Sequence, residues 1–248
     1  MFIPQDNERQ KITELKISSG YDTCFSITDD VFHNKKLYGR IEKPHDKFEI
    51  SISGCADTGL NVFEEFTAEG SSYPYCPFST TVFGAQTELT MPGANIRKYH
   101  SSLCLDTIPH PYNKTLRIMR AIPEVLKYNS GSTEIHETAE NALTLGKGVC
   151  QDYAHIMLSL LRMEQIPARY VVGMMLGEGA SHAWVEAFCR GYWYGFDPTN
   201  NKLVNDEYIK VSYGRDSSDC PVIKGNFYGN GMQTQKEEVN VEEIHAKE

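Results

Sequence analysis

The sequence contains no uninterrupted run of about 18 apolar residues, which is the length typical of a membrane-spanning helix. Its first ten residues, MFIPQDNERQ, also lack the basic segment and apolar run that mark a secretory signal. Both absences argue against an integral membrane protein and against export. We expect a soluble, cytoplasmic protein that does not bind membranes.

Closely spaced cysteine pairs are also missing. The chain has 7 cysteines, an odd number, and they stand far apart, at positions 24, 55, 76, 104, 150, 189 and 220. Zinc sites and disulfide frameworks depend on paired or closely spaced cysteines. We therefore expect reduced thiols in a reducing compartment, with neither a metal ion nor another cofactor.

The chain has no excess of positive charge. It carries 24 lysines and arginines against 33 acidic residues, which gives a net charge of −9 and a pI near 5.4. The basic residues are scattered, which argues against a nucleic-acid partner. Hydrophobic residues make up 40% of the 248 residues, enough for the core of one large or two modest domains.

Residues 1–105 read as a β-rich domain. Short runs with rough alternation of apolar and polar residues are separated by turn-forming residues and lie at 11–19, 35–43 and 47–53. A stretch rich in Gly, Pro, Ser and Thr follows, with brief β-like pieces at 80–83 and 86–90. This pattern predicts an N-terminal β-sandwich-like domain.

Residues 106–234 read as a second domain of the α+β class. Pro109-His110-Pro111 resembles a linker, because two prolines discourage a helix across them. Helices are predicted at 112–128, with Pro123 bending or breaking it, and at 136–145. Strands are predicted near 168–175, 182–189, 192–197 and 207–211. The acidic tail 235–248 is expected to fray.

A cysteine, a histidine and an aspartate follow one another in three distinctive segments. Cys150 lies in GKGVCQDYAH, His182 in SHAWVEAF and Asp197 in YWYGFDPTN. A cysteine nucleophile reacts as the thiolate, so it needs an imidazole beside it. That imidazole in turn needs a carboxylate that fixes its tautomer. These three residues are the candidate catalytic residues.

The spacing of His182 and Asp197 predicts that their side chains meet. Arg190-Gly191 reads as a two-residue hairpin turn, which pairs residues whose numbers sum to 381. In that register, Trp184 lies opposite Asp197, so His182 is a diagonal neighbour of Asp197 on the same face. A slip of one residue would place them on opposite faces.

Cys150 is predicted to open a helix. After Gly146 and Gly148, apolar residues recur at helical spacing from the cysteine onward, at positions 154, 157, 158 and 161. The unpaired N–H groups and positive dipole at a helix start favour a thiolate and can stabilise an oxyanion. Asp152 is interpreted as a capping carboxylate of the first turn.

These segments resemble the transglutaminase-like superfamily of papain-type cysteine enzymes, in particular its bacterial branch, many members of which are described as cysteine proteases. The resemblance covers roughly residues 130–230 and includes GKGVCQDYAH, IPARYVVG, SHAWVEAF, GFDPTN and GRD. It implies a papain-like core, in which a catalytic helix packs on an antiparallel sheet. It further implies Cys150 as nucleophile, His182 as general acid and base, and Asp197 as the residue that orients the histidine.

The sequence departs from the family pattern at two places. Gln165 stands where a glycine would end the catalytic helix, and a left-handed conformation there costs a non-glycine residue about 1 kcal/mol. The run SSDCPVIKG replaces a more aromatic, proline-rich segment, which indicates that this rim has its own specificity.

Two further residues are weaker substrate-binding candidates, and one pair is rejected as a metal site. The amide of Gln151 could polarise a carbonyl, although its position on the helix points it away from the thiol. Trp184 shares the face of His182, and we favour a packing role for it over a role as part of the cleft wall. Cys150 and His155 do not share a helix face, so they form no metal site.

The predicted chemistry is thiol-dependent acyl transfer on an amide or peptide substrate. Water as acceptor makes the protein a cysteine protease or amidase, which we favour because water needs no dedicated site. An amine acceptor would make it a protein-glutamine transglutaminase with the same three residues. A non-catalytic binding module that keeps the fold and a metal-dependent hydrolase are the remaining alternatives.

Overall fold

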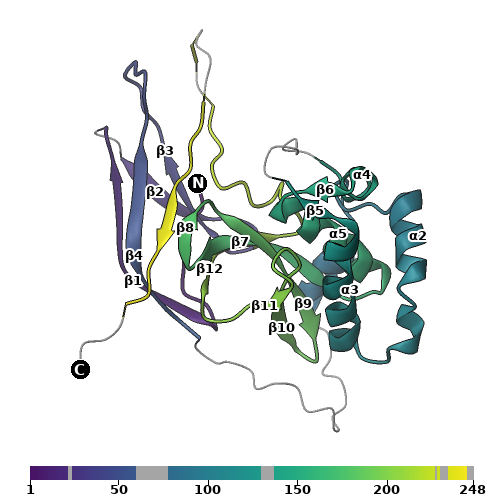
Figure 1. The fold of residues 1–248 in the computed structure, drawn as a ribbon. Helices are drawn as coiled ribbons and strands as arrows, with labels where there is room; N and C mark the ends of the chain where they lie inside the picture. Colours follow the sequence, from purple (N-terminus) through teal and green to yellow (C-terminus); the bar gives the residue numbers. More distant parts are fainter. Residues whose placement is uncertain (22–23, 60–77, 130–136, 227, 230–233, 245–248) are drawn as a thin grey trace.

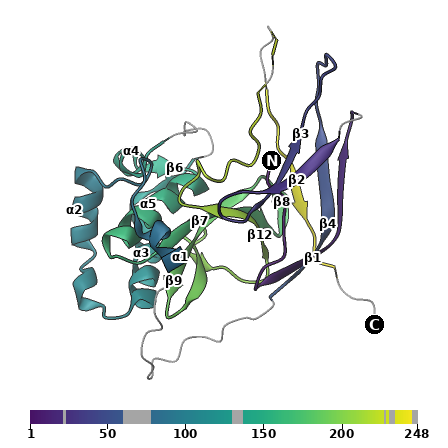
Figure 2. The same cartoon turned by 180° about the vertical axis from the view of Figure 1, so that it is seen from behind.

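The computed structural model describes residues 1–21, 24–59, 78–129, 137–226, 228–229 and 234–244. A five-stranded sheet lies in the middle of the molecule. Helices gather on one side of this sheet, and the N-terminal strands lie on the other side (Figures 1 and 2).

The central sheet is antiparallel throughout and has the order β11-β10-β9-β7-β12. It was predicted from alternating apolar residues, and three of its strands match the predicted ranges. Its strands are β7 (Ala168–Met175), β9 (His182–Cys189), β10 (Tyr192–Asp197), β11 (Lys202–Leu203) and β12 (Tyr208–Gly214). The strand predicted near 207–211 corresponds to β12, which ends three residues later, at Gly214. Strand β12 forms one edge of the sheet.

The β9–β10 hairpin has the predicted register. Its pairs run from Tyr192 opposite Cys189 to Phe196 opposite Val185. Both turn residues have positive φ angles, 51° at Arg190 and 89° at Gly191, as a two-residue turn of type I′ requires. The turn thereby fixes which side chains of β10 share a face with those of β9.

Helix α5 (Cys150–Met163) begins at the predicted cysteine. The backbone N–H of Val149 donates to Oδ2 of the buried Asp152 at 2.7 Å, so the predicted capping role of Asp152 is confirmed. The predicted apolar stripe of this helix is fully buried. It packs with alternate residues of β9, Ala183, Val185 and Ala187, in the main hydrophobic core.

Gln165 adopts the left-handed conformation that the sequence predicted to be costly, with φ of 57°. The N–H groups of Gln165 and Ile166 bond back to the carbonyls of Arg162 and Leu161, which ends α5. Gln165→Gly should therefore raise the free energy of unfolding by about 0.5–1 kcal/mol. Urea denaturation measures this change. Gln151→Gly, within the first turn of the same helix, should instead destabilise the protein.

Most of the remaining helices lie on the same side of the sheet as α5. Pro111 begins α3 at a position where its missing N–H costs nothing, and Pro123 lies in the last turn, two residues before the helix ends. Within the described residues, no helix is long and apolar enough to span a bilayer. The helices are α1 (Phe78–Thr81), η1 (Val82–Gly84), α2 (Ala94–Ser102), η2 (Leu105–Thr107), α3 (Pro111–Val125) and α4 (Ala139–Leu145).

The strands expected at 80–83 and 86–90 are wrong. Residues 78–84 are helical, and 85–93 contain no strand. Phe83 is buried with its ring edge-on to Trp193, and Gln86 donates to the carbonyl of Ser159 on α5. These contacts with the sheet and with α5 override the local β propensity of the Thr- and Val-containing run.

The N-terminal region is β-rich, as predicted. Its described residues form two antiparallel two-stranded sheets, β1 paired with β4 and β2 paired with β3. A short parallel pair, β5 with β6, lies beside the start of α5. The bounds are β1 (Gln10–Ser19), β2 (Phe25–Asp29), β3 (Lys35–Gly39), β4 (Ile50–Thr58), β5 (Lys127–Tyr128) and β6 (Lys147–Gly148).

Two observations bear on the predicted domain limits. Ile96 and Leu103 are buried in the same core as α3 and α5, so this core begins before residue 105. The division at that residue stays a prediction. The tail does not fray throughout its length, because β13 (Val239–Val241) pairs with β8 (Gly177–Gly179).

Candidate functional site

His182 and Asp197 meet as the hairpin register predicts. His182 begins β9 and Asp197 ends β10, and Nε2 of the histidine lies 2.8 Å from Oδ2 of the aspartate. Asp197 follows Phe196, which pairs with Val185, so its side chain projects from the face that carries His182. The two-residue turn therefore sets the register that brings the two side chains together.

Asp197 is completely buried and accepts five hydrogen bonds. Its Oδ2 accepts from His182, from the Asn200 amide at 2.7 Å and from the Tyr208 hydroxyl at 2.7 Å. Its Oδ1 accepts from the N–H groups of Thr199 and Asn200. Burial raises the pKa of this carboxyl, but the hydrogen bonds and the His182 charge outweigh it, so the pKa is lowered and Asp197 is ionised.

His182 is held in its protonated form. Burial lowers its pKa from the ordinary 6.5, but the hydrogen bonds to Asp197 and to Cys150 have the larger effect and raise the pKa to about 9. Since Nε2 faces Asp197, Nδ1 is the ring nitrogen that remains for the thiol. The three candidate residues therefore lie in one chain of contacts, from thiol to imidazole to carboxylate.

Cys150 reaches this position because a sharp bend precedes α5. Gly146 has a φ of 65° and ends α4, where a side chain would be strained. A Cβ on Gly148 would lie 2.5 Å from Oδ2 of Asp152, so only glycine fits there. The thiol therefore lies at the helix N-terminus, half-buried, with the positive end of the helix dipole beside it.

Trp184 and Gln151, the weaker substrate-binding candidates, occupy different surroundings. Trp184 is 1% exposed, packs with Val171 and Tyr208, and stacks near the His182 ring at 6.4 Å. This burial favours the packing interpretation. Gln151 is the second residue of α5 and is half-buried, and its role in substrate binding stays a prediction.

Tyr208 and Asn200 were missed by the sequence analysis. Asn200 stands three residues after Asp197 in the DPTN turn, and an asparagine there commonly bonds back to the local backbone or side chains. This spacing in the sequence could have indicated that Asn200 bonds to Asp197. Tyr208 comes from β12, which β7 and β9 separate from β10, so only the packing of the folded chain brings it to Asp197.

No three His, Cys, Asp or Glu side chains gather in a metal-binding arrangement within the part of the chain that the structure describes. His155 is buried one and a half turns beyond Cys150, and its Nε2 accepts from the backbone N–H of Ser217 at 3.2 Å. This bond ties α5 to the loop after β12. His155 therefore contributes to the packing behind the site.

His155 should make the protein sensitive to acid. Burial lowers its pKa from 6.5 to about 4, against the opposing effect of Asp216. The unfolded chain therefore binds this proton more tightly, and stability is lost as pH falls from about 6.5 to 4, by about 2–4 kcal/mol in total. His155→Gln keeps an acceptor for Ser217 and should weaken this pH dependence in urea denaturation. Replacing the exposed His45 by glutamine should leave it unchanged.

Comparison with known proteins connects the site with a family. Residues 103–198 match the transglutaminase-like superfamily. An uncharacterized protein of Mycobacterium leprae is 36% identical over 199 residues, which cover 75% of this chain and 65% of that protein. An uncharacterized protein of Mycobacterium tuberculosis is 38% identical over 119 residues, covering 42% of this chain and 38% of that protein. The matched regions span less than two thirds of either relative.

A solved structure shares the fold. The “Putative Cysteine Protease from Cytophaga hutchinsonii” superposes with a TM-score of 0.70 at 22% sequence identity, and the match covers 88% of this chain and 76% of that chain. The predicted α+β fold with a transglutaminase-like core is thereby confirmed.

Proposed function

We propose that the protein is a thiol-dependent acyl-transfer enzyme, because residues 103–198 match the transglutaminase-like superfamily. The observation that carries the proposal is the chain of contacts between Cys150, His182 and Asp197 at the start of α5. A buried carboxylate, an imidazole and a thiol in this order are what a cysteine nucleophile needs.

In the proposed reaction, the thiol proton has passed to His182, and the Cys150 thiolate attacks the carbonyl carbon of an amide or peptide bond. The tetrahedral intermediate collapses as His182 donates its proton to the leaving amine, and an acyl-enzyme remains. His182, now neutral, takes a proton from the second substrate as that substrate attacks the thioester. Asp197 keeps the ring oriented through both steps.

We favour hydrolysis as the second step, because water needs no acceptor site. The substrate is then a peptide or amide, and the activity that of a cysteine protease or amidase. With a primary amine as acceptor, the same acyl-enzyme would give a transglutaminase. We keep the cytoplasm as the proposed location.

The proposal is tested by incubating the protein with casein, with and without a biotinylated primary amine, and analysing the peptides by mass spectrometry. New peptide termini indicate hydrolysis, and biotin on glutamine side chains indicates amine transfer. Either product should disappear in Cys150→Ala and persist in Cys104→Ala, which removes an exposed thiol outside the site. Products that persist in Cys150→Ala would overturn the proposal.

A further inference from the structure

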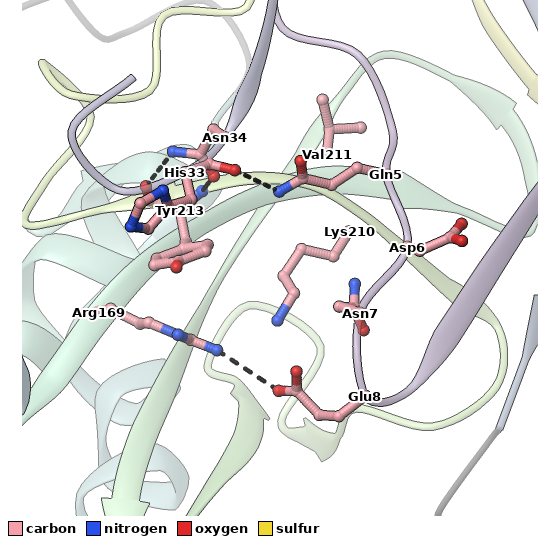
Figure 3. Close-up of a pocket in the computed structure, with 10 residues that line it drawn as sticks. All are labelled: Gln5, Asp6, Asn7, Glu8, His33, Asn34, Arg169, Lys210, Val211 and Tyr213. Carbon is pink, nitrogen blue, oxygen red and sulfur yellow. Dashed lines mark hydrogen bonds and ion pairs between the residues drawn. The ribbon is translucent and has the colours of Figure 1, made fainter. Parts of the chain in front are cut away.

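A cavity of about 280 Å³ lies on the face of the central sheet that the N-terminal region covers (Figure 3). Residues 5–8 and 33–34 form one side of it, and strands β7 and β12 form the other. Glu186, the partner of the cavity-lining Arg169 and Lys210, shares a face of β9 with His182 but lies four positions further along, about 13 Å away. The side chain of Trp184 lies between them, so the cavity is separate from the thiol site.

Two buried side-chain amides make the walls of this cavity rigid. Gln10 donates to the carbonyl of Lys210 at 2.7 Å and accepts from its N–H at 2.8 Å. Asn34 bonds in the same way to the carbonyl and N–H of Tyr213, at 2.7 and 3.0 Å. Each amide thus takes the place of a neighbouring strand at the edge of β12. The N-terminal region is thereby fixed on both sides of the cavity.

Two cations beside the cavity share one buried carboxylate. Arg169 and Glu186 face each other across β7 and β9, and Nε of the arginine lies 2.6 Å from Oε2 of the glutamate. Lys210 on β12 reaches both oxygens of Glu186, at 3.0 and 3.2 Å. Glu186 is 5% exposed, and its oxygens are occupied by these two partners. The sheet therefore presents one positive charge more than Glu186 balances.

The Arg169 guanidinium is held in place by two aromatic rings. It lies 4.3 Å from the centroid of Trp193 and 4.1 Å from that of Tyr213. Across the cavity, the carboxylate of Glu8 faces it at 3.9 Å, beyond hydrogen-bonding distance (Figure 3). The Glu8 side chain is 52% exposed. The Glu8 carboxylate is thus partly exposed to solvent, whereas the Arg169 side chain is only 8% exposed.

From this arrangement we infer that the cavity binds the carboxylate of a small molecule that also carries an amide, such as an N-acylated amino acid or the C-terminal end of a peptide. The carboxylate would pair with Arg169 and Lys210 at hydrogen-bonding distance, closer to Arg169 than the 3.9 Å of Glu8. Gln5 and Asn7 line the cavity and supply amide groups for the rest of the molecule. The volume is close to the lower limit of ligand pockets, which suits a ligand of this size.

The test is an NMR titration of the ¹⁵N-labelled protein at constant ionic strength, with N-acetylglycine as the probe and N-acetylglycinamide as its matched control. N-acetylglycine should shift the signals of β7 and β12, and the amide, which lacks the charge, should not. Glu8→Gln removes the competing carboxylate and should tighten binding at least about threefold. Glu42→Gln makes the same change of charge away from the cavity and should leave binding unchanged.

Lys210→Gln leaves Arg169 and Glu186 as a balanced pair and should weaken binding at least about tenfold. Circular dichroism checks that this variant folds, and the exposed Glu8 variant carries the test if it does not. His182→Ala should bind N-acetylglycine as the wild type does. The inference is overturned if the two probes bind alike, if Glu8→Gln has no effect, or if binding is lost with His182.

Discussion

Replacing His182 by alanine is expected to slow the labelling of Cys150 by iodoacetamide at pH 6 by about 100-fold. A cysteine without assistance has a reference pKa of about 8.5, so less than about 1% of it is thiolate at that pH. In the wild-type protein, burial lowers the pKa of His182, but its bonds to Asp197 and Cys150 raise it to about 9. The ring is therefore protonated at pH 6, and its charge favours the thiolate.

Peptide mass spectrometry measures this labelling residue by residue, across about pH 5–9. Cys104 is exposed and provides an internal control, because its labelling rate should be the same in both proteins. His45→Ala removes an exposed histidine and should change neither rate. Equal labelling of Cys150 in the wild type and in His182→Ala would show that the imidazole does not activate the thiol.

The position of the candidate site could be predicted from the sequence because local rules fix it. A two-residue turn at Arg190-Gly191 sets the register of its hairpin, and the period of two then places His182 and Asp197 on one face. The helix that starts at Cys150 follows from glycines and apolar spacing within a few residues. Both signals depend on short stretches of chain, where the backbone allows few alternatives.

Features that depend on distant contacts could not be predicted in this way. Helix α1 and η1 form at a run with β propensity because Phe83 is buried against the sheet, and nothing near Phe83 in the sequence indicates that partner. An acidic tail is expected to fray, yet β13 pairs with the distant strand β8. Tyr208 bonds to Asp197 although β7 and β9 separate their strands, and nothing near either residue in the sequence indicates this contact.

Asp197→Asn is expected to slow acyl-enzyme formation by about 10²–10⁴-fold. In the wild type, all five groups that contact Asp197 donate to it. An asparagine must turn its NH₂ group toward some of these donors. If the NH₂ group faces His182, Nε2 becomes an acceptor, and the ring proton moves to Nδ1. The nitrogen beside Cys150 could then no longer take the thiol proton.

The same substitution should change stability in a pH-dependent way. The pKa of Asp197 is lowered, because the bonds to His182, Tyr208 and Asn200 outweigh burial, so its contribution is present above about pH 3.8 and lost as pH falls. The pKa of His182 is raised, so its contribution is complete below 6.5 and lost as pH rises toward 9. The ion pair therefore stabilises the fold most between about pH 4 and 6.5.

Urea denaturation of the wild type and Asp197→Asn at a series of pH values measures this contribution. The difference in the free energy of unfolding should be largest between about pH 4 and 6.5, and about 2–3 kcal/mol of it should disappear by pH 9.5. Tyr208→Phe removes one hydrogen-bond donor to Asp197 but keeps the charge of Asp197. It should therefore destabilise the protein less than Asp197→Asn does, and this loss of stability should change little between about pH 6.5 and 9.5. A difference for Asp197→Asn that is constant with pH would mean that Asp197 acts as a packing and hydrogen-bonding residue, without an ion pair to His182.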